Sequence, residues 1–312
     1  MAAATVRNVS EKLGYLMKEY VKQIRWFIEK TWFGYALILP AALLVGLIIL
    51  VPILYAFWIS FHNMSYLQPG EAIWVGLQNY RQLLSDPMFW HSLKNTVIYV
   101  GTAVTSMYLL GLVLALGLKK QLPKMGIFRS TSLVPWVIPP VVNVIVWDWM
   151  LQSDFGLVNQ ILELFGLPTA TWFGSLTFAF PLVIMLRVWK DTPFVAIALM
   201  ASMRSIPDQM YEAAEVDGAG AWQKFRHITL PNISYMSMIM IVLETAACAN
   251  TFQLIYLSTG GGPINRTEVL STYIYSQAFQ KYALGYAAAL GVVMLLLLAI
   301  FAAIYLRLEE TE

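Results

Sequence analysis

The residues that could perform catalysis are few, and they are scattered along the chain. The three histidines, His62, His91 and His227, belong to different segments, and Cys248 is the single cysteine. A metal centre or a nucleophilic triad needs such residues in one cluster, and their spacing offers none. The sequence also lacks a Gly-x-x-x-x-Gly-Lys-Ser/Thr phosphate loop. We therefore expect that this chain is not an enzyme and holds no metal or cofactor of its own.

A second group of polar residues lies inside long apolar segments. Arg187, Lys190 and Asp191 fall together in one of them. A charge near mid-bilayer costs roughly 2.5 to 3.5 kcal/mol on insertion scales, so these three cannot all face lipid. Arg187 and Asp191, at i, i+4, are predicted to pair along one helix face beside a kink at Pro193. The alternatives are that Arg187 or Lys190 lines a substrate cavity, or that the group lies at the membrane surface.

Amides and an aromatic side chain in two other segments are further candidates for a solute path. Asn143 and Trp147 lie in one segment, and Asn250 and Gln253 lie in another, where i, i+3 spacing predicts a shared helix face. Amides beside an aromatic surface suit a solute rich in hydroxyl groups. Hydrogen bonding between helices is the alternative for the three amides. Glu244 is interpreted as structural.

The segment over residues 204–232 has the pattern of a docking element. Pro207 suits the first turn of a helix, and Gly218 suits its C-terminal end, because glycine adopts the left-handed conformation without strain. A second short helix is expected over residues 219–227, followed by a break at Leu230–Pro231. Small side chains that permit close approach, and carboxylates that orient a partner, gather in this segment: Glu212, Ala213, Ala214, Glu215, Asp217 and Ala219.

The composition places all these residues in a membrane protein. Of the 312 residues, 59% are hydrophobic and 12% are charged, whereas about 25% are charged in a soluble domain. The net charge of +2 argues against nucleic acid as a partner. The apolar blocks match the length of about 20 residues that a spanning helix needs. The sequence thus predicts an all-α membrane protein with six spans, at about 33–60, 94–118, 127–150, 176–203, 233–257 and 283–306.

The basic residues predict the orientation of these spans. On one side lie Arg7, Lys12, Lys18, Lys22, Arg25, Lys30, Lys119, Lys120, Lys124, Arg129, Arg204, Lys224, Arg226 and Arg307. The other side holds only Arg81, Lys94, Arg266 and Lys281. By the positive-inside rule, both termini of this multi-pass protein are predicted to be cytoplasmic. No cleavable signal peptide is expected, because the first apolar block follows a long basic segment. In that segment, residues 8–31 predict either a helix on the inner membrane surface or a solvated leader.

The 204–232 segment resembles a known family. Its Glu212-Ala213-Ala214, Asp217-Gly218-Ala219 and Ile228-Thr229-Leu230-Pro231 are similar to the EAA loop of ABC importer permeases, through which those permeases engage a separate ATPase. Motifs in the same order elsewhere are similar to the carbohydrate-uptake branch of maltose or glycerol-phosphate type: Gly76-Leu77-Gln78-Asn79-Tyr80, Phe89-Trp90, Asn95-Thr96, Pro135 with Pro139, Trp189 to Phe194, and Thr259 to Pro263. The last motif resembles the first of two different permeases.

The resemblance implies a type I importer fold with a cytoplasmic coupling helix, in a bacterial or archaeal cell membrane. It implies an N-terminal segment 1–32, a six-helix permease domain 33–308 and a tail 309–312. The implied partners are a second permease, two copies of an ATPase that hold ATP and Mg, and an extracytoplasmic binding protein that delivers a sugar, oligosaccharide or polyol. The implied coupling residues are Glu212, Ala213, Ala214, Asp217, Gly218, Ala219, Leu230 and Pro231. The alternative is a channel or a transporter driven by an ion gradient through charges such as Arg187, Asp191 and Glu244.

Overall fold

The computed structural model describes residues 34–65, 67, 70, 72–119 and 125–309, together with Lys22, Trp26 and Trp32. The helix predicted over residues 8–31 and the last residues of the tail, 310–312, therefore lie essentially outside the described residues. The chain divides into two compact units, Met1–Trp58 and Ile59–Glu312.

The first unit contains most of the first predicted span. A helix runs over Gly34–Ser60 with a mean hydropathy of 2.9. It includes a π-helical turn, η1 (Gly46–Leu50), followed by α2 (Val51–Ser60). Because this helix is apolar all round, it suits contact with lipid.

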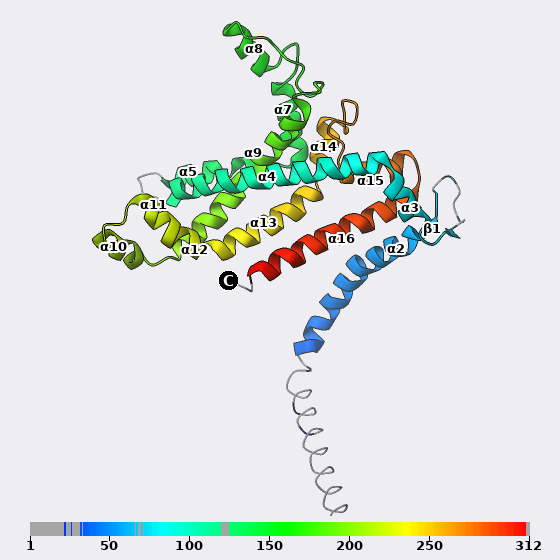
Figure 1. The fold of residues 1–312 in the computed structure, drawn as a ribbon, viewed down its shortest axis with the longest axis horizontal. Coiled ribbons are helices and arrows are strands. Elements are labelled where there is room, and N and C mark those ends of the chain that lie inside the picture. Colours follow the sequence, from blue (N-terminus) through cyan, green and yellow to red (C-terminus); the bar gives the residue numbers. More distant parts are fainter. Residues whose placement is uncertain are drawn as a thin grey trace, which may run out of the picture. The chain divides into compact units, whose positions relative to one another are not determined.

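The second unit is a bundle of helices with one short hairpin. Its main helices are α4 (Pro87–Lys119), α9 (Ala179–Arg204), α13 (Ser234–Ala249) and α16 (Leu284–Glu309), which Figure 1 shows side by side. The other elements are β1 (His62–Asn63), β2 (Ile73–Trp74), α3 (Gln78–Ser85), α5 (Met125–Ser132), α6 (Val134–Val137), α7 (Pro140–Met150), α8 (Leu157–Leu164), α10 (Asp208–Val216), α11 (Ala221–Lys224), η2 (Phe225–Thr229), α12 (Leu230–Asn232), α14 (Gln253–Ser258), α15 (Leu270–Tyr275) and η3 (Ser276–Gln280). Strands β1 and β2 pair antiparallel, with His62 opposite Trp74.

Three of the described helices are long and apolar enough to cross a membrane: Gly34–Ser60, Pro87–Lys119 and Leu284–Tyr305. Two bent pairs pass the same test when each is taken as one span. The pair Gly126–Val137 and Pro140–Met150 bends by 94°, and the pair Ala221–Asn232 and Ser234–Ala249 bends by 65°. The described helices thus offer up to five spans by length and composition. The remaining predicted span, the fourth at about 176–203, corresponds to α9, whose charged residues Arg187, Lys190 and Asp191 lower its apolar character, so six spans remain a prediction.

The bend in the third predicted span has a local cause. Pro139 and Pro140 follow Ile138, whose backbone is extended at φ −64° and ψ 127°. A residue before proline is pushed out of the helical region by the proline ring, and proline itself lacks the amide that would continue the helix. The chain therefore restarts as a new helix, with Pro140 in the first turn of α7.

The core of the bundle lies where α4 packs against α9. Ala103, Met107 and Ala115 on α4 are buried there. The two helices approach so closely that a Cβ atom at Gly111 would lie 2.8 Å from Val195 Cγ1. α9 itself continues as one helix through Pro193.

The carboxylate of Asp86 links three helices at the end of the bundle where α3 lies. Asp86 Oδ2 accepts hydrogen bonds from the hydroxyls of Tyr273 (2.5 Å) and Tyr286 (2.6 Å). Asp86 Oδ1 accepts one from the Met88 amide at 2.8 Å. Burial raises the pKa of Asp86, but the bonds from both tyrosines and from the Met88 and Phe89 amides outweigh burial and hold this pKa below its ordinary value. Ionised Asp86 therefore joins the start of α4 to α15 and α16. The opposite end of the bundle carries α10, α11 and α12 (Figure 1).

Candidate coupling element and solute path

The predicted docking segment, residues 204–232, forms a helix, a glycine turn and a second short helix. α10 ends at Val216, and Gly218 follows with a φ of +78°. The Ala219 amide donates to Ala214 O at 2.8 Å, and the Gly218 amide donates to Glu215 O at 3.0 Å. This pair of bonds is the Schellman arrangement that closes helices at a left-handed glycine. The predicted helix stop at Gly218 is therefore confirmed.

The side chain of Tyr211 contacts two other elements and so holds α10 against the bundle. Its hydroxyl hydrogen-bonds with Thr229 Oγ1 at 3.0 Å. Lys119 Nζ, at the end of α4, lies 4.1 Å from the centroid of the Tyr211 ring, a distance at which the cation is attracted to the ring face. Ala214, one turn further along α10, is half-buried and packs against the core. One side of α10 is thus fixed to both α4 and the η2 segment.

The other side of α10 is open. Glu212, Ala213 and Asp217 are exposed, and Val216 is 89% exposed. Glu215 is also exposed, and a hydrogen bond and the positive charge of Lys224, whose Nζ lies 2.6 Å from Glu215 Oε1, lower its pKa. This bridge ties α10 to α11 across the glycine turn. The open side therefore presents carboxylates, a small residue and an apolar residue on a fixed helix.

The segment leaves this element through a second bend. Leu230 and Pro231 are exposed and lie in α12, where the helix that starts at Ala221 continues through Pro231 to Asn232. The bend of 65° comes after Asn232, at the buried residue Ile233. The break before α13 is therefore two residues beyond the expected Leu230–Pro231 pair.

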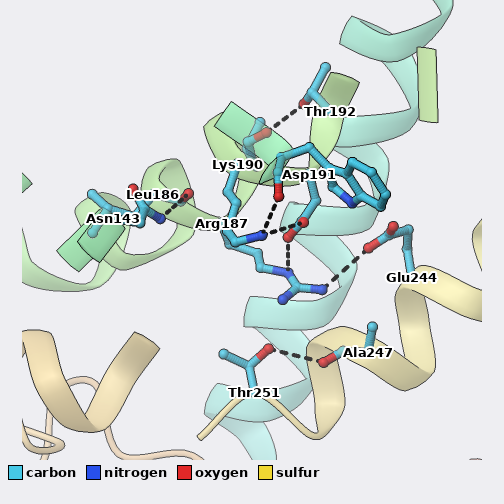
Figure 2. Close-up of polar contacts among 11 residues, drawn as sticks. Asn143, Leu186, Arg187, Lys190, Asp191, Thr192, Glu244, Ala247 and Thr251 are labelled. Carbon is cyan, nitrogen blue, oxygen red and sulfur yellow. Dashed lines mark hydrogen bonds and ion pairs between the residues drawn. The ribbon is translucent and has the colours of Figure 1, made fainter. Parts of the chain in front are cut away.

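A network of four charges joins α9 to α13 (Figure 2). Arg187 Nε lies 3.0 Å from Asp191 Oδ2, so the predicted i, i+4 pair is confirmed. Arg187 Nη2 also reaches Glu244 Oε2 on α13 at 3.3 Å. Lys190 Nζ lies 3.4 Å from Asp191 Oδ1. Two cations and two carboxylates therefore balance inside the bundle, as ions removed from water require.

Lys190 extends this network to a third helix. Its Nζ donates to Trp136 O of α6 at 3.1 Å, and the Trp136 ring stacks on Phe194 with centroids 5.1 Å apart. Lys190 and Asp191 are only 8% and 6% exposed. In this conformation Lys190 and Arg187 are held by carboxylates, so the geometry favours the ion-pair interpretation over a free position in a solute path.

Asn143 and Trp147 lie one turn apart on α7, facing α9. Asn143 is 1% exposed, and its Nδ2 is 3.5 Å from Leu186 O. Its Oδ1, and Nε1 of Trp147, are buried without a hydrogen-bond partner among the described residues. The Trp147 ring meets Trp189 edge to face at 5.6 Å. These contacts favour the interhelical role for Asn143. Asn143 Oδ1 and Trp147 Nε1 are two polar atoms at the α7–α9 interface that have no partner among the described residues.

Asn250 and Gln253 do not share a helix face, and that expectation is wrong. α13 ends at Ala249, and α14 begins at Gln253. The break occurs because Asn250 acts as the C-cap of α13, and its Nδ2 donates back to Ala246 O at 2.9 Å. Asn250 lines a cavity of about 520 Å³ next to α16, whereas Gln253 is exposed at the start of a helix that packs against α7.

Comparison with known protein families identifies the family of this chain. Residues 96–311, which include most of α4 and the later elements through α16, match the family model of binding-protein-dependent transport system inner membrane components. The chain belongs to this family. It is therefore a membrane-spanning permease subunit of an ABC-type, binding-protein-dependent importer, as the resemblance of the 204–232 segment implies.

Individual relatives agree over nearly the full length. The chain is 35% identical over 277 residues to the trehalose/maltose transport system permease protein MalF of Thermococcus litoralis, covering 88% of this chain and 92% of that protein. It is 32% identical to the sulfoquinovosyl glycerol transport system permease protein SmoG of Agrobacterium fabrum, covering 95% and 96%. Among solved structures, a bacterial ABC transporter involved in the import of alginate matches with a TM-score of 0.82 at 24% identity, covering 93% of this chain and 99% of that chain. This last similarity shows a shared type I importer permease fold.

The sequence reasoning missed the role of Tyr211 and the partner of Glu244. Tyr211 is near the Glu212-Ala213-Ala214 motif, and its i, i+3 spacing with Ala214 is the only local sign of a buried face. The partnership of Glu244 with Arg187 joins residues 57 positions apart, and no local spacing indicates it.

Proposed function

We propose that this permease is driven by a separate ATPase that docks on the open side of α10. The observation that carries the proposal is the combination of a fixed and a free side on this helix. Tyr211 and Ala214 anchor α10 to the bundle, while Glu212 and Ala213 remain exposed. Because these contacts hold α10 to the bundle, a movement of a partner docked on this helix would be transmitted to the bundle. ATP and Mg then belong to the partner, and this chain contributes no catalytic group.

The α10 end of the bundle faces the cytoplasm in this proposal. Lys119, Arg129, Arg204, Lys224 and Arg226 lie in elements at that end, and the positive-inside rule favours such an end on the cytoplasmic side. Both termini are then cytoplasmic, and the end with α3 and the hairpin faces outward.

The solute is a sugar, an oligosaccharide or a polyol. Two relatives at 35% and 32% identity carry names of trehalose/maltose and sulfoquinovosyl glycerol permeases, which share a hydroxyl-rich carbohydrate part. The amides of Asn250 and Gln253 are exposed in this chain and are suited to such hydroxyls. A second, different permease completes the path, and an extracytoplasmic binding protein delivers the solute.

Uptake into proteoliposomes tests the proposal. The permease is reconstituted with the second permease, the ATPase and the binding protein that are expected to be encoded beside it, and uptake of radiolabelled maltose, trehalose and histidine is measured. We expect uptake of at least one sugar, dependent on internal ATP and on the binding protein, and unaffected by a protonophore. Uptake that proceeds without ATP and collapses with the protonophore would instead identify a gradient-driven transporter.

A Glu212→Lys variant tests the docking side. The reversed charge on the open side of α10 should abolish co-purification of the ATPase while the permease still inserts. Asp154→Lys, an equivalent reversal at an exposed position in the loop before α8, is the matched control. Equal recovery of the ATPase with both variants would refute docking on α10.

A further inference from the structure

A long apolar groove runs between α4, α13 and α16, and we name it the α4–α16 groove. Its volume is about 580 Å³, and the described residues that line it are apolar except Thr96, Thr105, Thr245 and Tyr305. α13 packs against both α4 and α16, whereas α4 and α16 make little direct contact with each other. Figure 1 shows α13 between the other two helices. α13 is therefore the floor of the groove, and α4 and α16 are its walls.

The groove is open along its side. Val97 on the α4 wall is 64% exposed, and Leu297 on the α16 wall is 42% exposed. Gly101 also lies in the α4 wall, and a Cβ atom there would meet nothing within 4 Å. Thr96 Oγ1 already accepts a hydrogen bond from the Leu270 amide at 2.9 Å. An apolar ligand can therefore enter from the membrane without leaving this hydroxyl unpaired.

The dimensions of the groove suit one hydrocarbon chain. Its α4 wall extends from Leu93 to Thr105, and its α16 wall extends from Met294 to Tyr305. At about 1.5 Å per residue the walls are roughly 16 to 18 Å long, and one leaflet of the hydrocarbon core is about 15 Å thick. A volume of about 580 Å³ over that length leaves a mean cross-section of about 30 Å², whereas a helix with its side chains needs at least about 80 Å². A helix is therefore too wide to lie inside the groove.

A cation marks one end of the groove. Lys94 is exposed, and it precedes Val97 and Gly101 on α4 at intervals of three and four residues, which places the three in one stripe of the helix. Arg307 is near the other end, but it comes two residues after Tyr305 and so faces another side of α16. Of these two cations, Lys94 is the one on the groove side.

We propose that the α4–α16 groove binds one acyl chain of an anionic phospholipid, whose headgroup lies at Lys94. Lysine at the end of an apolar surface extends its ammonium group to the membrane–water boundary, where it attracts anionic headgroups. Bulk lipid is as apolar as the groove, so the preference comes from the contacts that fill the groove and from this charge. The site consists of described residues of this chain alone, so it depends on neither the solute nor the ATPase.

The test uses the transporter complex in nanodiscs of phosphatidylcholine that contain a small fraction of phosphatidylglycerol with a diazirine at the end of one acyl chain. After irradiation, labelled peptides are identified by mass spectrometry. We expect labels on α4 and α16 near Thr105 and Tyr305, the residues that line the far end of the groove from Lys94. Excess unlabelled phosphatidylglycerol should reduce this labelling, because a site saturates. Labelling that the excess lipid leaves unchanged would show contact with bulk lipid and overturn the proposal.

Two pairs of variants separate the groove from its charge. Gly101→Trp fills the groove and should reduce the labelling at least about five-fold, whereas Gly117→Trp, at a position on α4 that is equally open but does not line the groove, should leave it unchanged. Lys94→Gln should weaken binding of phosphatidylglycerol about 3- to 10-fold. Arg81→Gln, which removes another exposed cation on α3, is its control.

Equal labelling in Gly101→Trp and Gly117→Trp would overturn the acyl-chain site, and equal binding in Lys94→Gln and Arg81→Gln would overturn the position of the headgroup. A wild-type complex without labels in the groove, together with loss of the second permease from Gly101→Trp, would assign the groove to a helix of that partner. That result would also overturn the proposal. The competition experiment on the wild-type complex keeps the test decisive even where a variant fails to assemble.

Discussion

Replacing Glu244 alone with methionine should destabilise the bundle strongly, whereas replacing both Glu244 and Arg187 with methionine should not. The four charges of the network sum to zero, and Arg187 Nη2 lies 3.3 Å from Glu244 Oε2. Without Glu244, Arg187 and Lys190 share the single carboxylate of Asp191, and one buried positive charge is uncompensated. Leaving such a charge costs about 3 to 5 kcal/mol. Because Asp191 still pairs with Arg187 at 3.0 Å, we expect a loss near the lower limit.

The double variant leaves the Lys190–Asp191 pair, whose charges balance at 3.4 Å. Exchanging a buried ion pair for apolar side chains of similar volume is often neutral or stabilising. The free energy of unfolding of the double variant should therefore lie within about 1 kcal/mol of the wild-type value, which makes the double variant about 2 to 4 kcal/mol more stable than the Glu244 single variant.

Cys248 provides the assay, because it is the single cysteine and is 1% exposed. Thermal unfolding in detergent is followed by the reaction of this thiol with a dye that fluoresces on coupling. Glu163→Met on α8, which removes an exposed carboxylate, is the control and should change stability by less than about 0.5 kcal/mol. A double variant that is no more stable than the Glu244 single variant would refute the reasoning, since it would show that the two charges do not stabilise each other.

Sugar uptake by the same double variant separates the two interpretations of Arg187. A stable variant with wild-type uptake supports a structural ion pair. A stable variant that has lost uptake places Arg187 in the solute path.

Three further predictions concern other parts of the fold. Gly111→Ala should cost about 1 to 3 kcal/mol by separating α4 from α9, whereas Gly101→Ala, whose Cβ would meet nothing within 4 Å, should be neutral or stabilising in the same thermal assay. Gly218→Ala introduces a Cβ at a φ of +78°, so it should weaken the end of α10 by about 1 to 2 kcal/mol and reduce ATPase recovery in the co-purification assay. Asp86 has a lowered pKa when folded, so its contribution to stability is present above the ordinary value of 3.8 and is lost as pH falls through the folded pKa. Unfolding midpoints between pH 6 and pH 3 should therefore fall less steeply in Asp86→Asn, and parallel curves would contradict this.

The features that the sequence predicted correctly are determined by neighbouring residues. The glycine stop at Gly218 depends on one left-handed residue and two bonds within the same turn. The Arg187–Asp191 pair depends on the i, i+4 geometry of a helix. Apolar blocks of spanning length likewise reflect the thickness of the bilayer rather than the details of packing.

The features that the sequence missed depend on contacts between distant segments or on small local choices. Glu244 finds Arg187 only because α13 packs beside α9. The sequence did not predict the end of α13 at Ala249, because an asparagine inside an apolar segment can take either of two structural roles. It can continue the helix, or it can bond back to the preceding turn, as Asn250 does with Ala246 O. The shape of the loop over residues 259–268 likewise depends on Asn95 and His91, which lie more than one hundred and seventy positions away from the loop residues that they contact.

The anchoring of α10 determines where a movement of the docked ATPase would enter the permease. Tyr211 links this helix to Thr229 at 3.0 Å and to Lys119 through its ring. Thr229 leads through α12 and the bend at Ile233 into α13, which carries Glu244, and Lys119 ends α4, which packs against α9. A displacement of α10 therefore reaches α13 and α4 through these contacts, and α9 through residues 205–207. Since the Arg187–Glu244 pair is the ion pair between α9 and α13 in the described network, it lies at the junction that such a displacement would shear. The pair that links α9 to α13 in this conformation would therefore have to adjust if the two helices shifted relative to each other.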